Sequence, residues 1–500
     1  MGVVVKQSFW GTFITYLGVI IGYVNALYLR PEFFSLNEIG LFTLVTANAM
    51  ILSPLTTLGM NGTFLKYYPS LKDSQQLVNQ FFTFQFLFVI LGNIFILSIG
   101  FFAEDWIVDQ FSKGSSEYAK YLTVTAIIVI VNSLFDHLYS YAASVLKVIY
   151  PSFLREVFLR FGAVALVLGY AFGYFEFDWA VKGLAINYII AFFLLFLQLM
   201  ISNGLRLDFS FKMIDKEWRK KILNFGIYSM SIAVSFAILN NASYTQVSSM
   251  MGDAANGVFV TCFFIGVIVE MPRRNMARIL APLISDAMND KDIPRVEQMY
   301  KKGSITMAVI GFLLFIGIVT NINDLLSFIP QGDDFSKGLG VVWAVSGAKL
   351  ILMVSSFSGE IINYSKDYWY NLLFQALAAL SIVILNYIFI PFYGLNGVAI
   401  SYTITIILHV LAKYLLIRKT LGITPFLNKH FSLLIISVLV LIGAYYFQLD
   451  LPPVVNIAIR SILTTLVFVF LVYKLKISDD INRLIDMVFS RIGAINQNNK

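Results

Sequence analysis

The sequence predicts an all-α integral membrane protein with 14 transmembrane helices, built as two parallel six-helix repeats plus two C-terminal helices. Three observations predict this fold. The 500-residue chain is 58% hydrophobic and only 13% charged, whereas soluble domains carry about 25% charged residues. Apolar runs of roughly 20 residues, the length that crosses a bilayer, recur along its whole length. Similar segments also recur at one nearly constant offset.

Fourteen runs meet the length rule, beginning with a first span that lacks a small-residue cleavage site and is therefore expected to be retained rather than cleaved as a signal peptide. Some connections, such as "PFYG" (391–394), are so short that the neighbouring helices must be antiparallel hairpins. The predicted spans 1 to 14 are 8–29, 39–64, 79–103, 118–146, 154–175, 180–202, 222–244, 255–272, 304–328, 338–360, 367–390, 394–417, 429–447 and 454–474.

The basic residues predict the orientation. With the N-terminus in the cytoplasm, 29 of the 36 Lys and Arg residues fall on the cytoplasmic side. Lys and Arg are enriched in cytoplasmic loops of membrane proteins. This distribution places both termini in the cytoplasm and explains the formal net charge of +7 without a nucleic-acid partner.

Three pairs of segments indicate an internal duplication. "GLAINY" (183–188) matches "GVAISY" (397–402), "EIGLF" (38–42) resembles "ANGVF" (255–259), and Trp10-Gly11 resembles Phe225-Gly226, at offsets of 214, 217 and 215 residues. Because six spans is an even number, both copies enter the membrane in the same direction and are related by an axis along the membrane normal.

The repeats define the predicted domains. These are an N-terminal lobe with spans 1–6 (1–205), a cytoplasmic linker (206–221), a C-terminal lobe with spans 7–12 (222–420), spans 13 and 14 (421–475), and a tail (476–500). In the tail one helical face is apolar, which predicts a helix on the cytoplasmic membrane surface. That face comprises Ile477, Ile481, Leu484, Ile485, Val488, Ile492 and Ile495.

Several kinds of site are not expected. Cys262 is the only cysteine, and His137, His409 and His430 are far apart in the sequence, so neither a disulfide nor a metal site is predicted. The chain has no Gly-x-x-x-x-Gly-Lys loop for ATP. We expect no cofactor and no catalytic residue.

The pattern of 6 + 6 + 2 spans, the signature shared by spans 6 and 12, and "EMPRRNMARILAPLISDAM" (270–288) resemble one family. It is the multidrug/oligosaccharidyl-lipid/polysaccharide (MOP) exporter superfamily, in its polysaccharide-biosynthesis branch of Wzx-like oligosaccharide flippases. The resemblance implies a V-shaped pair of lobes and a central cavity, positively charged and lined by spans 1, 2, 7 and 8. In a related branch that carries the peptidoglycan precursor, two extra C-terminal helices hold the polyprenyl tail, and spans 13 and 14 look similar.

The end of span 8 holds the strongest candidates. Glu270 and Arg274 stand four residues apart on one helical face, whereas Arg273 points about 100° away from Arg274. We therefore expect the two arginines to have different partners, and Arg278 to be a loop anchor. The group is either a binding site or a cytoplasmic anchor whose glutamate neutralises one arginine. Since the resemblance puts span 8 at the cavity, Arg273 and Arg274 are candidates for substrate binding and Glu270 for coupling.

Pro272 lies in the same segment. It lacks a backbone N–H, so we expect it to kink span 8 and leave the carbonyl of Ile268 free.

Three further candidates lie in the first two spans. Lys66 occupies a position of span 2 slightly beyond the one that corresponds to the span 8 arginines, so the two could form a two-sided clamp on a diphosphate. It is equally explained as a lysine at a cytoplasmic helix end. Asn25 and Arg30 follow the glycines of span 1, Gly11, Gly18 and Gly22, which predict a close-packing face. Asn25 is a cavity candidate, and Arg30 either meets substrate at the outer mouth or flanks the helix.

Two ionisable groups are predicted inside spans. A charge at the bilayer centre costs about 2.5–3.5 kcal/mol, so each must face protein or water. Lys349 in span 10 is a substrate-binding candidate, and the repeat offset places it opposite position 135, beside Asp136 in span 4. Asp136 either carries a coupling ion or is held in a structural ion pair.

We expect a flippase that moves an undecaprenyl-diphosphate-linked oligosaccharide across the bacterial inner membrane by alternating access, for surface polysaccharide synthesis. A cation-coupled multidrug exporter of the same superfamily is the alternative, although the ionisable residues of the spans are mostly basic. A membrane-embedded sugar polymerase or ligase is disfavoured because no large external loop is predicted. Other expected partners are membrane lipids, a polysaccharide polymerase and glycosyltransferases; we expect a monomer.

Overall fold

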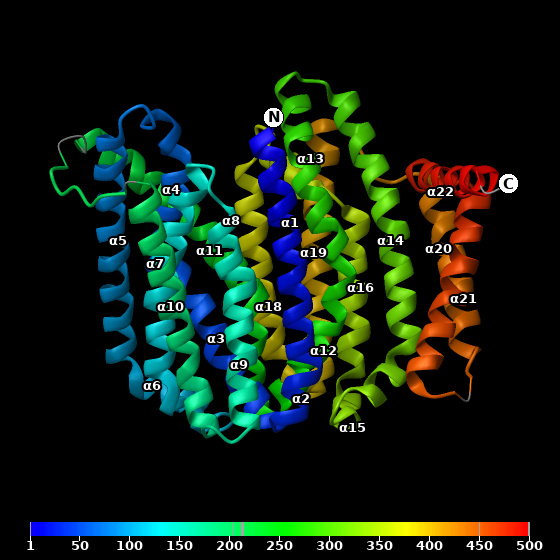
Figure 1. The fold of residues 1–500 in the computed structure, drawn as a ribbon, viewed down its shortest axis with the longest axis horizontal. Coiled ribbons are helices and arrows are strands. Elements are labelled where there is room, and N and C mark those ends of the chain that lie inside the picture. The colour runs from blue at the N-terminus through cyan, green and yellow to red at the C-terminus, as the bar shows by residue number, and fades with distance from the viewer. Residues whose placement is uncertain (1, 204, 212–214, 450, 499–500) are drawn as a thin grey trace. The chain divides into compact units, whose positions relative to one another are not determined.

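The computed structural model describes residues 2–203, 205–211, 215–449 and 451–498, and every regular element in these ranges is helical (Figure 1). The chain packs into two compact units. Unit 1 comprises Met1–Thr261 and Ala379–Val398, and unit 2 comprises Cys262–Ala378 and Ala399–Lys500. Three helices run from one unit into the other: α12 (Asp253–Val267), α18 (Trp369–Tyr393) and α19 (Leu395–Leu421).

The other helices belong to one unit each. Those of unit 1 are α1 (Gly2–Val24), η1 (Asn25–Leu29), α2 (Arg30–Phe33), α3 (Leu36–Thr56), α4 (Met60–Tyr67), η2 (Tyr68–Ser70), α5 (Gln75–Phe102), α6 (Glu104–Phe111), η3 (Ser116–Tyr121), α7 (Leu122–Ser144), α8 (Ile149–Phe153), η4 (Leu154–Phe158), α9 (Leu159–Ala171), α10 (Phe177–Asn203) and α11 (Lys216–Met251). Those of unit 2 are η5 (Ile268–Glu270), α13 (Met271–Asn289), α14 (Ile293–Phe328), α15 (Gly332–Phe335), η6 (Ser336–Gly338), α16 (Leu339–Ser355), α17 (Ser358–Asn363), α20 (Asn428–Tyr446), α21 (Pro453–Lys474) and α22 (Asp479–Asn498).

Thirteen helices of the described residues are long and apolar enough to cross a membrane. The predicted span 5 is not among them, although α8, η4 and α9 form one unbroken helix over residues 149–171. The reason lies in its sequence, because Arg155, Glu156 and Arg160 fall within its first twelve residues. With this helix included, the structure matches the predicted all-α membrane fold and its 14 spans.

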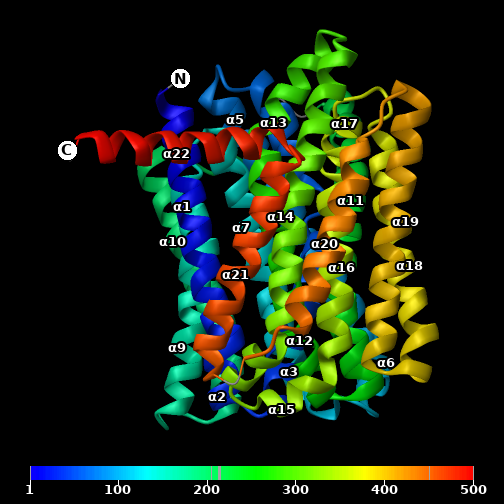
Figure 2. The ribbon, with the colours of Figure 1, turned by 90° about the vertical axis from the view of Figure 1, so that its right-hand side faces the viewer.

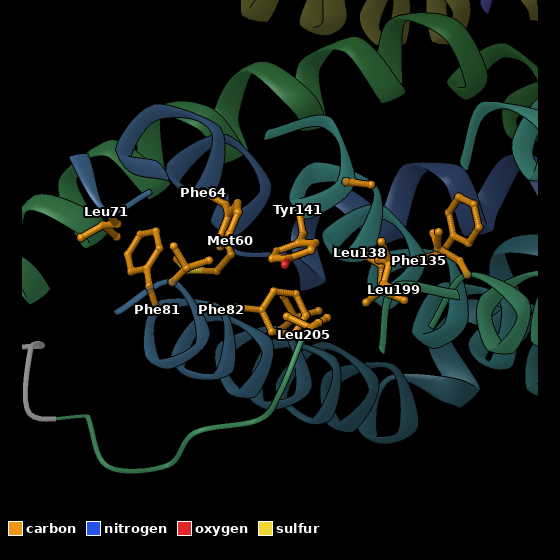
Figure 3. Packing of buried hydrophobic residues seen from close by; sticks show 14 of the residues in the cluster. Met60, Phe64, Leu71, Phe81, Phe82, Phe135, Leu138, Tyr141, Leu199 and Leu205 are labelled. Carbon is orange, nitrogen blue, oxygen red and sulfur yellow. The ribbon is translucent and has the colours of Figure 1, made fainter. Parts of the chain in front are cut away.

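An aromatic core holds unit 1 together at the end where α4 lies. Phe64 of α4 stacks on Phe81 of α5 with ring centroids 5.5 Å apart, and Phe82 stacks on His137 of α7 at 4.9 Å. Figure 3 shows the rings of Phe64, Phe81, Phe82 and Tyr141 close together between the helices. Rings packed in this way contribute both buried apolar area and specific ring–ring contacts.

The predicted linker is fastened to this core. Leu205, the residue before the linker, is buried within the core, and the carboxylate of Asp208 in the linker accepts a hydrogen bond from Gln80 at 3.2 Å. The Asp208 N–H donates to Thr83 at 2.9 Å. Residues 212–214 of the linker lie outside the described residues, and α11 begins at Lys216, inside the stretch predicted as linker. The division into lobes with these boundaries stays a prediction.

The starts of α3 and α12 meet in a reciprocal contact within unit 1. Gly40 lies directly against the backbone carbonyl of Asp253, and Gly257 lies directly against the carbonyl of Leu36. The Asn256 side chain also donates to the Gly40 carbonyl at 3.0 Å. Gly40 and Gly257 are 217 residues apart, as are Leu36 and Asp253. The offset that relates "EIGLF" to "ANGVF" therefore relates the two halves of this contact as well.

In unit 2, α20 and α21 pack against α14 and each other. Arg460 of α21 is buried, donates to Asp324 of α14 at 3.0 Å and to the Ala444 carbonyl of α20 at 3.0 Å. A guanidinium that bonds to two neighbouring helices fixes the α20–α21 hairpin on α14.

The tail forms α22, which contacts α14 and α21 and lies across the direction of the long helices (Figure 2). Ile477 is buried at its base, and Asp486 accepts from the Tyr473 hydroxyl at 2.7 Å. Leu484 and Met487 remain exposed, consistent with an amphipathic surface helix. The side chains of Val488, Ile492 and Ile495 fall outside the described residues.

Candidate functional site

One carboxylate in unit 2 is surrounded by three cations. Glu270 accepts from Arg273 at 2.7 Å, from Arg274 at 3.4 Å and from Lys349 at 2.6 Å. The expectation that the two arginines have different partners is therefore wrong. A carboxylate has two oxygens, and positions three and four residues along a helix both lie next to it, so each arginine bonds to its own oxygen.

The helix break at this cluster lies where Pro272 predicts it. The α-helix α12 ends at Val267, a 3₁₀ turn covers Ile268–Glu270, and α13 resumes with Pro272 in its first turn. The Ile268 carbonyl is not free as expected, because it accepts a hydrogen bond from the Met271 N–H. The tightened turn satisfies the carbonyl that the proline would otherwise leave without a donor.

A second break faces the same cluster. The helix predicted as span 10 stops at Ser355 and resumes as α17 at Ser358, and the Ser356 carbonyl between them accepts from Arg273 at 3.3 Å. Ser356 has φ +48°, a left-handed conformation that costs a non-glycine residue energy and persists where its surroundings hold it. Arg273 thus joins the broken helix of span 8 to the broken helix of span 10.

Lys349 is the buried member of the cluster. Its side chain is 5% exposed and lies 5.6 Å from the ring centroid of Tyr402. A buried ammonium is stable only when it is paired, and Glu270 provides that partner. Tyr402 is the last residue of the "GVAISY" signature, so the repeat motif ends beside the ion cluster. In the sequence the motif indicated a duplication, but it did not indicate a site.

Two further charged residues of unit 2, Lys413 and Glu360, were not among the predicted site residues. Lys413 of α19 lies within electrostatic reach of both Glu360 and Arg273. One oxygen of Glu360 is buried with no hydrogen-bond partner among the described residues. Because Lys413 and Glu360 are 53 residues apart, no local spacing could have paired them.

The cluster as a whole is positive. Its four cations are Arg273, Arg274, Lys349 and Lys413, and its two carboxylates are Glu270 and Glu360, which gives a net charge of +2. The Arg274 side chain is 53% exposed, so part of this charge is open to an incoming group. Arg278, the predicted anchor, is exposed and has no hydrogen bond or ion pair among the described residues.

The candidates of the first two spans lie in unit 1. Lys66 is exposed and sits 3.8 Å from the ring centroid of Phe225. Arg30 donates to Thr43 at 3.3 Å and lies over the ring of Phe42, and Asn25 is 3% exposed. Since Lys66 belongs to unit 1 and the span 8 arginines to unit 2, the two-sided clamp stays a prediction.

Asp136 also lies in unit 1, where Arg155 is its ion-pair partner and Asn132 donates to it at 3.4 Å. This geometry matches the predicted alternative in which Asp136 is held in a structural ion pair. A role for Asp136 in ion coupling stays a prediction. The repeat offset places Lys349 opposite position 135, one residue from Asp136, yet each of the two charged residues is paired within its own unit.

The described helices have the fold of solved transporter structures, one of which is described as a member of the MOP superfamily, and this agrees with the predicted fold. Structural comparison shows this fold in two kinds of transporter. A lipid II flippase, MurJ, in an inward closed conformation aligns over 93% of this chain and 98% of its own, with a TM-score of 0.76 and 17% identity.

The second kind is the MATE transporter. An inward-facing multidrug resistance MATE transporter of the MOP superfamily aligns over 82% of this chain and 94% of its own, with a TM-score of 0.63 and 14% identity. A MATE transporter of Vibrio cholerae aligns over 84% of this chain and 99% of its own, with a TM-score of 0.56 and 15% identity. No family model and no curated protein matches the sequence. The chain is thus a multi-pass membrane protein that shares its fold with these structures.

Proposed function

We propose that this protein is a flippase that moves a polyprenyl-diphosphate-linked oligosaccharide across the bacterial inner membrane by alternating access. The observation that carries the proposal is the net positive cluster around Glu270. Arginine binds phosphate oxygens through two parallel hydrogen bonds, and lysine adds a point charge. A cluster of that composition favours a diphosphate over a cationic cargo.

The extent of the structural match supports the same choice. The flippase structure covers 93% of this chain, compared with 82–84% for the MATE structures. The lipid tail would remain in the bilayer while the head group crosses. Both open states must then bind the head group about equally well, since a strong preference for one state would trap it.

The test is flipping of a lipid-diphosphate sugar in proteoliposomes by the wild type and by Arg273→Ala and Arg274→Ala. A charge-assisted hydrogen bond contributes about 1.5–3 kcal/mol, so we expect each change to slow flipping by about tenfold or more. Arg278→Ala is the matched control, because this exposed arginine lies one turn further along α13, and it should leave the rate unchanged. Unchanged rates in both cluster variants would refute the assignment of the anion site.

The alternative, a cation-coupled multidrug exporter, is favoured by the likeness to MATE transporters. The same proteoliposomes distinguish the two functions. Gradient-driven efflux of ethidium without flipping of any lipid diphosphate would establish the exporter in place of the flippase.

A further inference from the structure

The helix over residues 149–171 carries charges at a depth where lipid is a poor solvent. Arg160 is its middle residue, with eleven residues on either side, or roughly 16 Å at the α-helical rise. The hydrocarbon core is about 30 Å thick, so a bilayer centred on this helix places Arg160 near its middle. Its ion-pair partner Glu156, at 2.8 Å, lies one turn away.

These side chains are not fully buried. Arg160 and Arg155 are each 36% exposed, and their partners Glu156 and Asp136 are each 25% exposed. Exposing a charged side chain to lipid at the bilayer centre costs about 2.5–3.5 kcal/mol of free energy. The exposed parts of these four groups therefore face water or a polar ligand.

Helix α1 forms one wall of this polar region. Gly18 lies directly against the backbone of Glu156, and an added Cβ at Gly22 would contact the side chain of Arg160. The predicted close-packing face is therefore confirmed at Gly18 and Gly22, but not at Gly11, where an added Cβ would meet no atom within 4 Å. Asn25 follows Gly22 on the same face; it is buried, and its amide oxygen has no hydrogen-bond partner among the described residues. The glycines leave room for charged side chains where larger residues would fill the space.

Helices α7 and α10 form the other walls. The guanidinium of Arg155 bonds to Asp136 and lies 4.6 Å from the ring centroid of Tyr139, both on α7. Tyr188 of α10 is within electrostatic reach of Arg155, Asp136 and Arg160. Tyr188 ends the "GLAINY" signature, as Tyr402 ends "GVAISY", so both copies of the motif place a tyrosine beside an ion cluster.

Two of these helices are distorted at the polar region. Residues Asn25–Leu29 and Leu154–Phe158 are single π turns, and the helices that carry them are packed together. Such turns occur mostly at functional sites, where they redirect side chains.

We propose that unit 1 carries a second polar site, which binds the saccharide part of the lipid-linked substrate. Sugar hydroxyls both donate and accept hydrogen bonds, and this site supplies two guanidinium groups, two carboxylates, a phenol and an amide. Its ionic charges cancel, unlike the net +2 of the other cluster. A charge-balanced array of planar donors and acceptors suits a neutral polyol better than an anion.

An ion-coupling site is the competing use of the same residues. Each carboxylate here is already paired with an arginine at hydrogen-bond distance, so a coupling cation would have to displace a fixed positive charge. That is unfavourable, and a hydroxyl can add to such a pair without breaking it.

The inference rests on the proposed flippase function, and the test separates the two. The probes are undecaprenyl diphosphate without sugar and the same lipid bearing glucose, galactose or N-acetylglucosamine, with binding measured by native mass spectrometry of the detergent-solubilised protein. The variants are the double change Glu156→Gln with Arg160→Gln, and Tyr188→Phe, which removes one hydroxyl and preserves packing. The control is Asp178→Asn with Lys182→Gln, an ion pair of unit 1 that is more than 40% exposed on both sides.

The wild type should bind at least one sugar-bearing lipid about tenfold more tightly than the bare diphosphate. Both unit 1 variants should lose this preference and bind the bare lipid within twofold of the wild type, whereas Arg273→Ala should weaken all four probes. A wild type without sugar preference, or unit 1 variants that weaken all probes equally, would overturn the second site alone. Failure of every probe to bind would overturn the flippase function and the second site with it.

Discussion

Glu270 shows how one side chain sets the electrostatics of a membrane site. Its carboxylate is buried and accepts from Arg273, Arg274 and Lys349. Removing one member of a buried ion pair leaves the others uncompensated, at a cost of about 3–5 kcal/mol. Glu270 therefore holds the cations in place, and a diphosphate that enters would compete with it for the arginines.

Replacing Glu270 by Gln should lower the melting temperature of the detergent-solubilised protein strongly, because three positive charges would lose their shared partner. The measurement is thermal unfolding followed by intrinsic fluorescence, and Lys349→Met added to Glu270→Gln should restore part of the loss. Asp334→Asn is the control, since its ion pair with Lys337 is exposed on both sides and surface pairs contribute about 1 kcal/mol or less. Equal effects of Glu270→Gln and Asp334→Asn would contradict this account.

Only ion pairs between residues close together along one helix could be predicted from the sequence. Glu270 and Arg274 follow from their spacing, but Lys349 is 79 residues from Glu270, and only the packing of α16 on the turn at Ile268–Glu270 brings them together. Tyr188 and Tyr402 are a different case. Both tyrosines end a copy of the repeated signature. A polar residue inside a span has to be hydrogen-bonded or face a site, so the signature could have identified both residues as candidates.

At the scale of elements, the closest approach of α3 and α12 depends on glycine. A side chain at Gly257 would collide with the Leu36 carbonyl, and one at Gly40 with the Asp253 carbonyl. Neither carbonyl can yield without moving the start of the helix to which it belongs, because both are backbone atoms. This contact therefore fixes the register of the two helices.

Gly257→Ala should destabilise the protein by about 1–3 kcal/mol, the usual cost of overpacking. Gly317→Ala is the matched control in α14, where an added Cβ meets no atom within 4 Å. Alanine is about 1 kcal/mol better than glycine in a helix, so the control should be neutral or stabilising. Thermal unfolding of the two variants side by side checks the prediction, and a harmless Gly257→Ala would refute the tight contact.

The helices themselves were predictable because apolar length is a strong signal, but their interruptions were only partly so. Pro272 predicted the break in span 8. Nothing in "LMVSSFSGE" (352–360) predicted the left-handed conformation of Ser356. The Ser356 carbonyl accepts a hydrogen bond from Arg273 of another helix, which holds this conformation. The π turn at Asn25 likewise has no proline or glycine within it to mark it.

At the scale of the whole chain, charge differs between the two ends of unit 1. Basic residues gather at the end where α4, α8 and the start of α11 lie, and acidic residues gather at the opposite end around α2 and α6 (Figure 1). The basic end carries Lys66, Lys72, Lys147, Arg219, Lys220 and Lys221, together with Asp73, Asp215 and Glu217. The acidic end carries Glu32, Glu38, Glu104, Asp105, Asp109 and Glu117, together with Arg30, Lys113 and Lys120. This polarity supports a cytoplasmic position for the basic end.

Single cysteines test the orientation in intact cells of a bacterial host. Lys72→Cys and Asp109→Cys both replace exposed residues, and the native Cys262 is fully buried and should give little background. A membrane-impermeant maleimide should label position 109 in intact cells and position 72 only after permeabilisation. The reverse pattern would invert the predicted topology.

The reciprocal contact of Gly40 and Gly257 also bears on how such a chain could arise. Each glycine meets the carbonyl that corresponds to the one met by the other, which is the geometry of an isologous interface in a two-fold symmetric homodimer. A shorter ancestor with six spans, paired with a second copy in the same orientation, would have made this contact twice across its dimer axis. Gene fusion would then convert an association between subunits into a permanent intramolecular one, after which the two ion clusters could diverge, one staying neutral and the other gaining positive charge.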